Sequence, residues 1–413
     1  MNIDTSLRAS ARGGAEGGAQ GRLRSLLVVA EVALAVLLVV GSGLLLRSFV
    51  KIVSVDPGFR SEGLTIARVS LPASRYDTRA RQSAFFEEML SRVRGLPEIS
   101  AVSAAATPPL EQGREIFFRI EGRGDDGDVR RAKVAGSIAI DPRYFDVMGI
   151  ALKRGRLLEA SDTPGRELAV VVDETLANRY WPGENPVGQR LREGYTGTGQ
   201  PWMRVVGVVG SVHQHGLAVE AKPVMYVSHR QLGVREMTIV VRGRAGHAAV
   251  GAAIRSVVRR VDADQPVAEV RTMEDVLAAS VAAKRFSASL LTVFAGLALL
   301  LAAVGVYAVM SYSVARRTRE IGIRKALGAP PRELIGVVLG QGLTLAGFGL
   351  ALGCLGAWWL TRYLASELHQ VGATDPLTFG AACLLLLGVA AAACYAPARR
   401  ASAVDPVVAL RQE

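Results

Sequence analysis

Four long apolar segments constrain this chain more than any other feature of its sequence. They cover residues 25–46, 286–315, 334–363 and 377–396. A helix needs about 20 predominantly apolar residues to cross the hydrocarbon core of a bilayer, and each segment is long enough. We therefore predict four transmembrane helices in these ranges.

Basic side chains gather on one side of these predicted helices. The loop 366–376 has no Lys or Arg, whereas the opposite side carries Arg316, Arg317, Arg319, Arg324, Lys325, Arg332, Arg399 and Arg400. Short basic loops stay cytoplasmic, so we predict that both termini are cytoplasmic and that residues 47–284 lie outside. The net charge of +12 is then explained by the membrane topology and by attraction to anionic lipid. The sequence has no nucleic-acid-binding motif.

The two ends of the chain differ from the apolar segments. Residues 1–24 are rich in Gly and Ala and are expected to form a flexible cytoplasmic lead. Residues 397–413 are expected to form a basic cytoplasmic tail. Glu31 lies inside the first segment and is either a functional intramembrane carboxylate or a side chain that reaches headgroups or Arg22 and Arg24. We favour the second interpretation because Glu31 is within two turns of the interface.

Residues 47–284 alternate predicted strands and helices. Strand–helix–strand units open and close this region, as in split βαβ folds, and they form a first lobe of residues 60–106 and 236–272. The stretch 107–235 contains short strands and turns and is expected to form an inserted β-rich lobe. The predicted fold class is an α-helical membrane protein with four transmembrane helices and a large two-lobed α+β extracytoplasmic domain.

The loop 316–332 has the pattern of a short helix between two membrane spans. Glu320 and Arg324 are four residues apart, a spacing that stabilises a helix by a few tenths of a kcal/mol. Gly328 suits the position after the last turn, and two prolines follow it. A short basic helix held between two spans is well placed to press on a soluble partner.

Small residues in the third segment predict close helix packing. Gly336 and Gly340 form one G-x-x-x-G motif, and Gly349 and Gly353 form another. Such motifs let helices approach closely in lipid. The sequence leaves open which helix is the partner.

Patterns for catalysis are absent from the sequence. No G-x-x-x-x-G-K-[ST] phosphate loop occurs, and none of the lysines follows a glycine. His213 and His215 form an H-x-H, which we interpret as a surface turn because zinc needs three or four ligands. No Ser-His-Asp or G-x-S-x-G pattern is visible. We therefore expect no catalytic residue, no metal site and no cofactor of its own.

Several stretches together resemble one family. The run EIGIRKALGA within 319–329 resembles the cytoplasmic coupling segment of MacB/FtsX-type permeases of ATP-driven (ABC) systems. Residues 141–156, 171–191 and 204–217 are similar to the MacB-type extracytoplasmic domain, and the closing PARRASAVDPVVALR resembles the family's permease domain. The nearest group is the second half of duplicated orphan permeases. The chain lacks a first half, so a split gene, a fragment and a single-half permease remain alternatives.

The resemblance implies a transport subunit of the bacterial inner membrane. A separate cytoplasmic ATPase would bind ATP and push the coupling segment, and the outer domain would move. A second permease copy or half would complete a dimer in the bilayer, and a periplasmic adaptor or outer-membrane protein is a further candidate partner. The implied coupling residues are Arg319, Glu320, Ile321, Gly322, Ile323, Arg324, Lys325, Leu327 and Gly328.

Three functions remain open under this resemblance. The first is export of antibiotics, peptides or lipophilic compounds, or handling of lipoproteins as in lipoprotein-release permeases. The second is FtsX-like regulation of a cell-wall hydrolase. The third is ligand sensing, which would need a cytoplasmic signalling domain. The predicted two-lobed outer domain favours the first.

Overall fold

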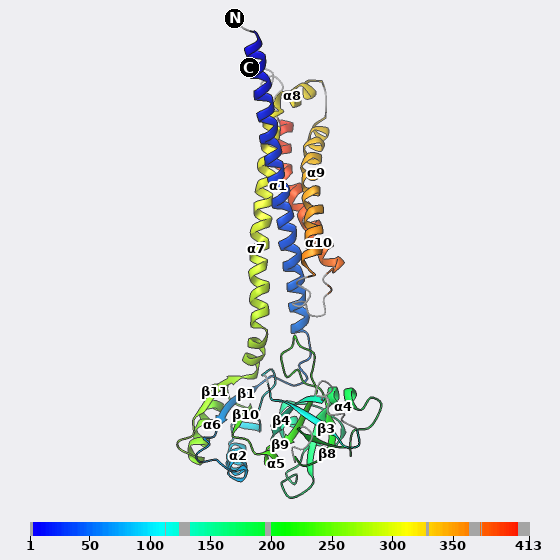
Figure 1. Ribbon diagram of the computed structural model, residues 1–413. Coiled ribbons are helices and arrows are strands. Elements are labelled where there is room, and N and C mark those ends of the chain that lie inside the picture. Colours follow the sequence, from blue (N-terminus) through cyan, green and yellow to red (C-terminus); the bar gives the residue numbers. More distant parts are fainter. Residues whose placement is uncertain are drawn as a thin grey trace. The chain divides into compact units, whose positions relative to one another are not determined.

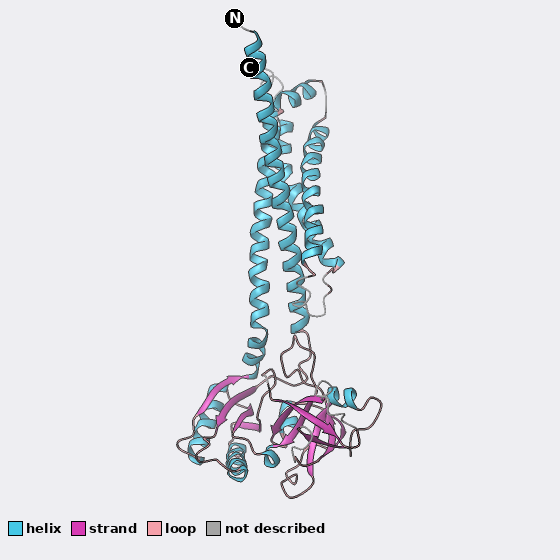
Figure 2. Ribbon diagram, viewed as in Figure 1, coloured by secondary structure: helices cyan, strands magenta, loops and turns pink. Residues whose placement is uncertain are grey.

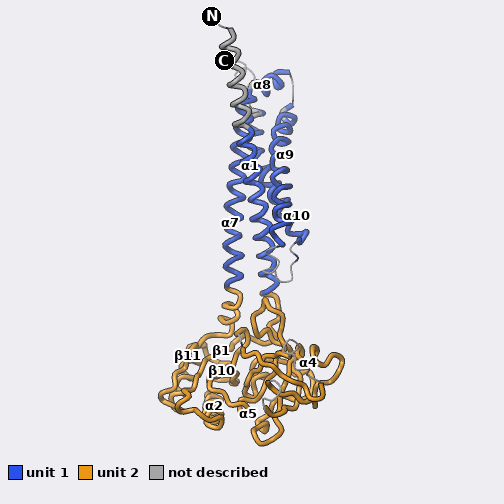
Figure 3. The backbone as a smooth tube through the Cα atoms, in the orientation of Figure 1, with its two compact units in different colours: residues 1–52, 283–413 blue, residues 53–282 orange. Residues whose placement is uncertain are grey.

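The computed structural model describes residues 3–111, 113–123, 133–194, 200–327, 330–362, 372 and 374–403. The chain divides into two compact units (Figure 3). One contains Met1–Ile52 and Ala283–Glu413, and the other contains Val53–Ala282. Figure 2 shows that the first unit is helical and that the strands belong to the second.

Within the described part of the chain, four helices that lie wholly or mostly in the first unit are long and apolar enough to cross a membrane. They are α1 (Ile3–Val53), α7 (Met273–Arg316), α9 (Pro331–Leu360) and α10 (Pro376–Ala403). Figure 1 shows them with the short helix α8 (Thr318–Ala326) between α7 and α9. Helix α7 runs without a break from Met273 through the second predicted span.

Both ends of this unit differ from the prediction. The structure gives helix from Ile3, where a flexible lead was expected, because Ala, Arg and Gln favour helix and the first span supplies a formed helix to extend. Likewise α10 does not stop at residue 396 but runs through Pro397 to Ala403. Ala398 is fully buried, and its packing offsets the hydrogen bond that proline cannot donate. Residues 404–413 of the predicted tail lie outside the described residues.

One of the two G-x-x-x-G motifs packs against the first span. A methyl group on Gly349 would lie 2.7 Å from Cβ of Val32, and one on Gly353 would lie 2.6 Å from Cβ of Val36. At Gly336 and Gly340 a methyl group would meet no atom within 4 Å. The close approach that the sequence predicted therefore joins α9 to α1, and only the second motif makes it.

The first lobe of the second unit is a four-stranded antiparallel layer with two helices. Its elements are β1 (Leu64–Ser70), α2 (Arg79–Arg94), β2 (Ile99–Ala105), β10 (Glu236–Gly243), α6 (His247–Val261) and β11 (Val267–Thr272). The strand order is β11-β1-β10-β2, and each neighbouring pair is antiparallel. This order is that of a split βαβ fold, as predicted. The core between sheet and helices includes Phe86, Met89, Ile254 and Val257, all buried.

The second lobe is a closed barrel of short strands. Its ring contains β3 (Glu115–Ile120), β4 (Lys133–Ile140), β6 (Leu168–Asp173), β7 (Arg190–Glu193), β8 (Met203–Val209) and β9 (Val224–Ser228). Parallel pairing of β4 with β9 closes the ring β4-β3-β7-β8-β6-β9. Strand β5 (Leu152–Gly155) pairs with β8, and the helices are α3 (Tyr144–Met148), α4 (Glu174–Tyr180) and α5 (His229–Leu232). Phe118, Trp181 and Met225 belong to the core of this lobe.

The two lobes share one narrow connection in the sheet. Strands β2 and β4 pair through Ala105 and Ile140 alone. The prediction of an inserted β-rich lobe within a split βαβ lobe is therefore correct, and the closure of the insert into a barrel was not anticipated.

Candidate functional site

Helix α8 is separated from α7 by a local break at Arg317. Its backbone (φ −104°, ψ 13°) departs from helical values, so it caps α8 rather than continuing α7. The Thr318 hydroxyl donates back to the carbonyls of Val314 (3.1 Å) and Ala315 (2.9 Å), which ties the new helix to the end of α7. At the other side, α9 begins with Pro331, a residue suited to the first helical turn.

The apolar side chains of α8 divide between two faces. Ile323 is 44% exposed and Leu327 is 83% exposed, four residues apart on one face. Gly322 is buried and Ile321 is half-buried. Ile321 lines a small cavity with Leu334 and Val338 of α9. The structure therefore turns Ile321 toward α9 and leaves Ile323 and Leu327 as the apolar surface.

Charged side chains fix α8 and frame its exposed face. Arg324 donates to Glu320 at 2.8 Å, and both side chains are about half exposed, so this pair contributes only a few tenths of a kcal/mol. The Lys325 ammonium donates to the carbonyl of Ser402 at 3.0 Å and links α8 to the end of α10. Lys325 is thus a structural contact as well as a surface charge.

Two of the predicted coupling positions cannot be placed. Gly328 lies outside the described residues, and so does the side chain of Arg319. The remaining predicted positions lie on or directly after α8. They form one short element with an apolar pair on its open face and basic groups around it.

Sequence analysis missed two interhelical contacts of this unit. Arg47 on α1 forms an ion pair with Asp375, which also accepts from the amide and hydroxyl of Thr378 at the start of α10. The Arg24 guanidinium lies 4.3 Å from the ring centre of Tyr312 on α7. Neither contact follows from local spacing in the sequence, where Arg24 was considered only as a partner of Glu31.

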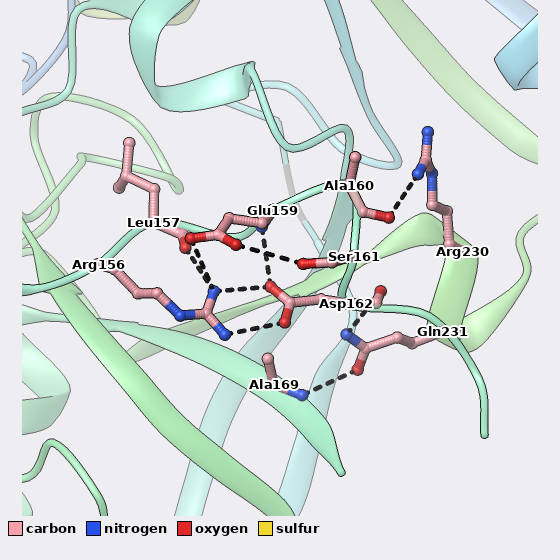
Figure 4. Close-up of polar contacts among 9 residues, drawn as sticks. All are labelled: Arg156, Leu157, Glu159, Ala160, Ser161, Asp162, Ala169, Arg230 and Gln231. Carbon is pink, nitrogen blue, oxygen red and sulfur yellow. Dashed lines mark hydrogen bonds and ion pairs between the residues drawn. The ribbon is translucent and has the colours of Figure 1, made fainter. Parts of the chain in front are cut away.

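A polar cluster holds the segment 156–169 of the second lobe in place (Figure 4). Arg156 donates to both carboxylate oxygens of Asp162, at 2.8 and 2.9 Å, and the amide of Glu159 donates to the same group. Burial alone would raise the pKa of Asp162, but these hydrogen bonds and the Arg156 charge lower it. Gln231 spans from the carbonyl of Asp162 to the amide of Ala169. These hydrogen bonds join neighbouring segments of the lobe, so we infer that the cluster stabilises it.

Asp173 is a fully buried carboxylate of the outer domain. It caps α4 by accepting from the amide of Leu176 at 2.8 Å, and it also accepts from the amide of Val224 at 3.0 Å. Burial raises its pKa from 3.8 to about 6, against the effect of these hydrogen bonds. The side chain joins β6, α4 and β9, so we assign it a structural role.

The two histidines singled out in the sequence have separate partners. His213 Nδ1 lies 2.9 Å from the carbonyl oxygen of Val219, and His215 Nε2 lies 3.4 Å from Glu115. Across the described ranges, no three His, Cys, Asp or Glu side chains are grouped so that they could hold a metal ion.

The fold and the site define a class of protein. It is an integral membrane protein with an α+β domain inserted between its first and second spans and a short basic helix between its second and third. Two family models match: the MacB-like periplasmic core domain over residues 25–257 and the FtsX-like permease C-terminal domain over residues 292–406. The chain belongs to the MacB/FtsX family of ABC-type permeases, which are inner-membrane proteins with an extracytoplasmic domain.

Several known proteins are similar to this chain at low sequence identity. The chain is 28% identical over 301 residues to a macrolide export ATP-binding/permease protein MacB of Agrobacterium fabrum, covering 69% of this chain and 45% of the relative. It is 27% identical over 337 residues to the uncharacterized ABC transporter permease YvrN of Bacillus subtilis, covering 76% and 78%. The periplasmic region of MacB from Actinobacillus actinomycetemcomitans matches 55% of this chain and 95% of that structure, with 16% identity and a TM-score of 0.36. The chain thus spans less than half the length of the MacB relative.

Proposed function

We propose that this chain is the membrane subunit of an ABC-type exporter and transmits the work of a separate ATPase to its outer domain. ATP is bound by the partner subunit, and this chain contributes no cofactor and no catalytic residue. Both termini and α8 lie on the cytoplasmic side, where the basic residues around α8 favour them. The cargo class is antibiotics, peptides or lipophilic compounds.

The exposed apolar pair of α8 is the observation that carries this proposal. Ile323 on α8 and Leu327 directly after it are exposed apolar side chains, and helix-in-groove contacts use such i, i+4 anchors. Arg324 and Lys325 lie beside them and would meet an acidic rim on the ATPase. Ile321 lies on the side of α8 that faces α9. A force on α8 would pass through this contact into the membrane helices.

The family supports a two-fold assembly. A second copy of this chain or a separate permease half would supply the other coupling helix for a pair of ATPase subunits. A periplasmic adaptor or an outer-membrane protein would take the cargo from the outer domain. The relatives named for macrolide export contain both ATP-binding and permease functions in their names, which supports an ATPase as the first partner.

Co-purification tests the docking surface directly. The tagged chain is isolated from native membranes in mild detergent with and without ATP, and co-purifying proteins are identified by mass spectrometry. Leu327→Asp and Ile323→Asp should lose an ATPase subunit that the unchanged chain retains. Leu23→Asp is the matched control, since Leu23 is also an exposed apolar side chain at this end of the bundle, 59% exposed on α1.

The outcomes separate the alternatives. Retention of the ATPase by both α8 variants would refute docking through this helix. A cell-wall hydrolase that co-purifies through the outer domain, without export activity, would favour an FtsX-like regulator. Ile321→Asp should keep the ATPase bound while reducing coupled transport, because it disturbs the contact with α9 and leaves the exposed pair in place.

A further inference from the structure

A cavity of about 530 Å³ lies within the helical unit, lined by residues of α1, α7 and α9 and by Arg317, which precedes α8. Figure 1 shows where these helices run. Arg24 from α1, Tyr312 and Arg316 from α7, Gln341 from α9 and the capping residue Arg317 all line it. Its volume falls in the range of sites that bind small molecules. Neither the coupling role of α8 nor the family match assigns a ligand to it.

The polar end of this cavity is strongly basic. The Arg24 guanidinium lies 4.3 Å and the Arg316 guanidinium 6.0 Å from the ring centre of Tyr312, so one ring holds both. No acidic side chain lines the cavity, and in the described part of the chain no carboxylate lies within 4 Å of Arg24, Arg316 or Arg317. Three guanidinium groups at one site repel each other unless an anion lies between them. Arginine is also the side chain best suited to bind phosphate through paired hydrogen bonds.

The other end of the cavity is apolar. Val309 and Met310 of α7 and Leu345 of α9 form this part of the wall. Arg24 precedes the apolar run of α1, and Arg316 follows the apolar run of α7. Basic side chains at such positions favour the membrane surface, so we place the basic end of the cavity at the interface and the apolar end deeper. A ligand that fills both ends has a phosphate at the interface and a hydrocarbon chain directed into the bilayer.

We propose that this cavity binds one anionic phospholipid, with the phosphate between Arg24, Arg316 and Arg317 and an acyl chain along the apolar wall. Phosphate is also the chemistry of soluble anions, but a soluble phosphate would leave the apolar wall unfilled. Basic sites at the cytoplasmic membrane surface attract anionic lipid by about 1 kcal/mol per charge.

The lipid would also steady the start of α8. Arg317 lines this cavity and the small cavity behind Ile321, so an anion bound to its guanidinium restrains the residue that begins the coupling helix. This consequence rests on the proposed function, whereas lipid binding does not. A binding measurement without any ATPase therefore tests the site separately.

The test is native mass spectrometry of the full chain in detergent, titrated with phosphatidylglycerol or with phosphatidylcholine. The unchanged chain should retain one phosphatidylglycerol at concentrations where phosphatidylcholine does not bind. Arg24→Gln combined with Arg316→Gln should weaken this binding about thirtyfold, because two charges are lost. Arg22→Gln is the matched control, since Arg22 is exposed on the same helix and does not line the cavity.

A second variant and a competitor complete the test. Leu345→Trp fills the apolar end without changing charge, and it should weaken phosphatidylglycerol binding while thermal stability is retained. Millimolar inorganic phosphate should not displace the lipid. Equal loss in Arg22→Gln would overturn the proposal in favour of general surface charge. Displacement by inorganic phosphate, or full binding in Leu345→Trp, would overturn the lipid as the ligand.

Discussion

The contact between α9 and α1 makes a quantitative prediction about two glycines. A methyl group on Gly349 would lie 2.7 Å from Cβ of Val32 and 2.9 Å from the carbonyl oxygen of Val29. On Gly353 it would lie 2.6 Å from Cβ of Val36. These separations are too short for carbon, and the neighbours are backbone or β-branched atoms that cannot rotate away, so α1 and α9 must separate.

The change in unfolding free energy on replacing these glycines with alanine has two opposing contributions. Overpacking of this kind costs about 1–3 kcal/mol at each site, while alanine gains about 1 kcal/mol over glycine in a helix interior. The double variant Gly349→Ala and Gly353→Ala should therefore lose about 2 kcal/mol of unfolding free energy. Gly336→Ala with Gly340→Ala makes the same chemical change on the same helix, where nothing lies within 4 Å, and should lose none.

Titration with SDS, followed by circular dichroism, compares the unfolding free energies of both double variants with the unchanged chain. The reasoning is refuted if the two pairs shift equally, or if only the pair at 336 and 340 is destabilised. Either result would mean that α1 does not pack against α9 at the second motif.

Three further predictions concern the outer domain and the bundle. The pKa of Asp173 is about 6 in the folded chain and 3.8 in the unfolded chain, so the folded state binds this proton more tightly. The stability that the bound proton adds is therefore complete below about pH 4 and is lost as pH rises through about 6. The unfolding free energy of the unchanged chain, relative to that of Asp173→Asn, should thus fall by about 3 kcal/mol from acidic to neutral pH. Denaturant unfolding measures both, and an equal difference between the two proteins at the two pH values would contradict this prediction. Asp162→Asn should destabilise the second lobe by about 1–2 kcal/mol by weakening its guanidinium pair, measured by tryptophan fluorescence, and an unchanged midpoint would argue against the cluster. The sulfur atoms of Cys354 and Cys383 are 3.5 Å apart, so these residues should form an intrachain disulfide when membranes are treated with a mild oxidant. Peptide mapping should find Cys394 still free. Failure of the pair to oxidise would contradict the packing of α9 against α10.

The sequence predicted elements whose signal is local. Apolar periodicity alone predicts a strand at Ile99–Ala105, a strand at Glu115–Ile120 and a helix at His247–Val261. The structure has all three with these bounds. Strand β7 was missed because its sequence, RLRE, buries only Leu191 and lacks a strand pattern. Ring closure was missed because β4 and β9 pair across more than 80 residues of chain.

The candidate site was predictable in position but not in orientation. The run 319–328 carries its own helical and family signal, so the location of α8 followed from the sequence. The outward direction of Ile323 and the inward direction of Ile321 depend on the packing of α8 against α9, which no local pattern in the sequence gives. Likewise, Lys325 was expected at the surface, and its contact with Ser402 needs the continuation of α10 beyond Pro397.

The barrel closure also sets an order for assembly during export of the chain. The ring of the second lobe is complete once β9 ends at Ser228, whereas the first lobe still lacks β10 and β11 at that point. Strands β1 and β2 have no direct pairing with each other, since β10 lies between them. The second lobe can therefore fold before β10 and β11 of the first lobe have been exported. The sheet of the first lobe then forms after the inserted barrel has closed.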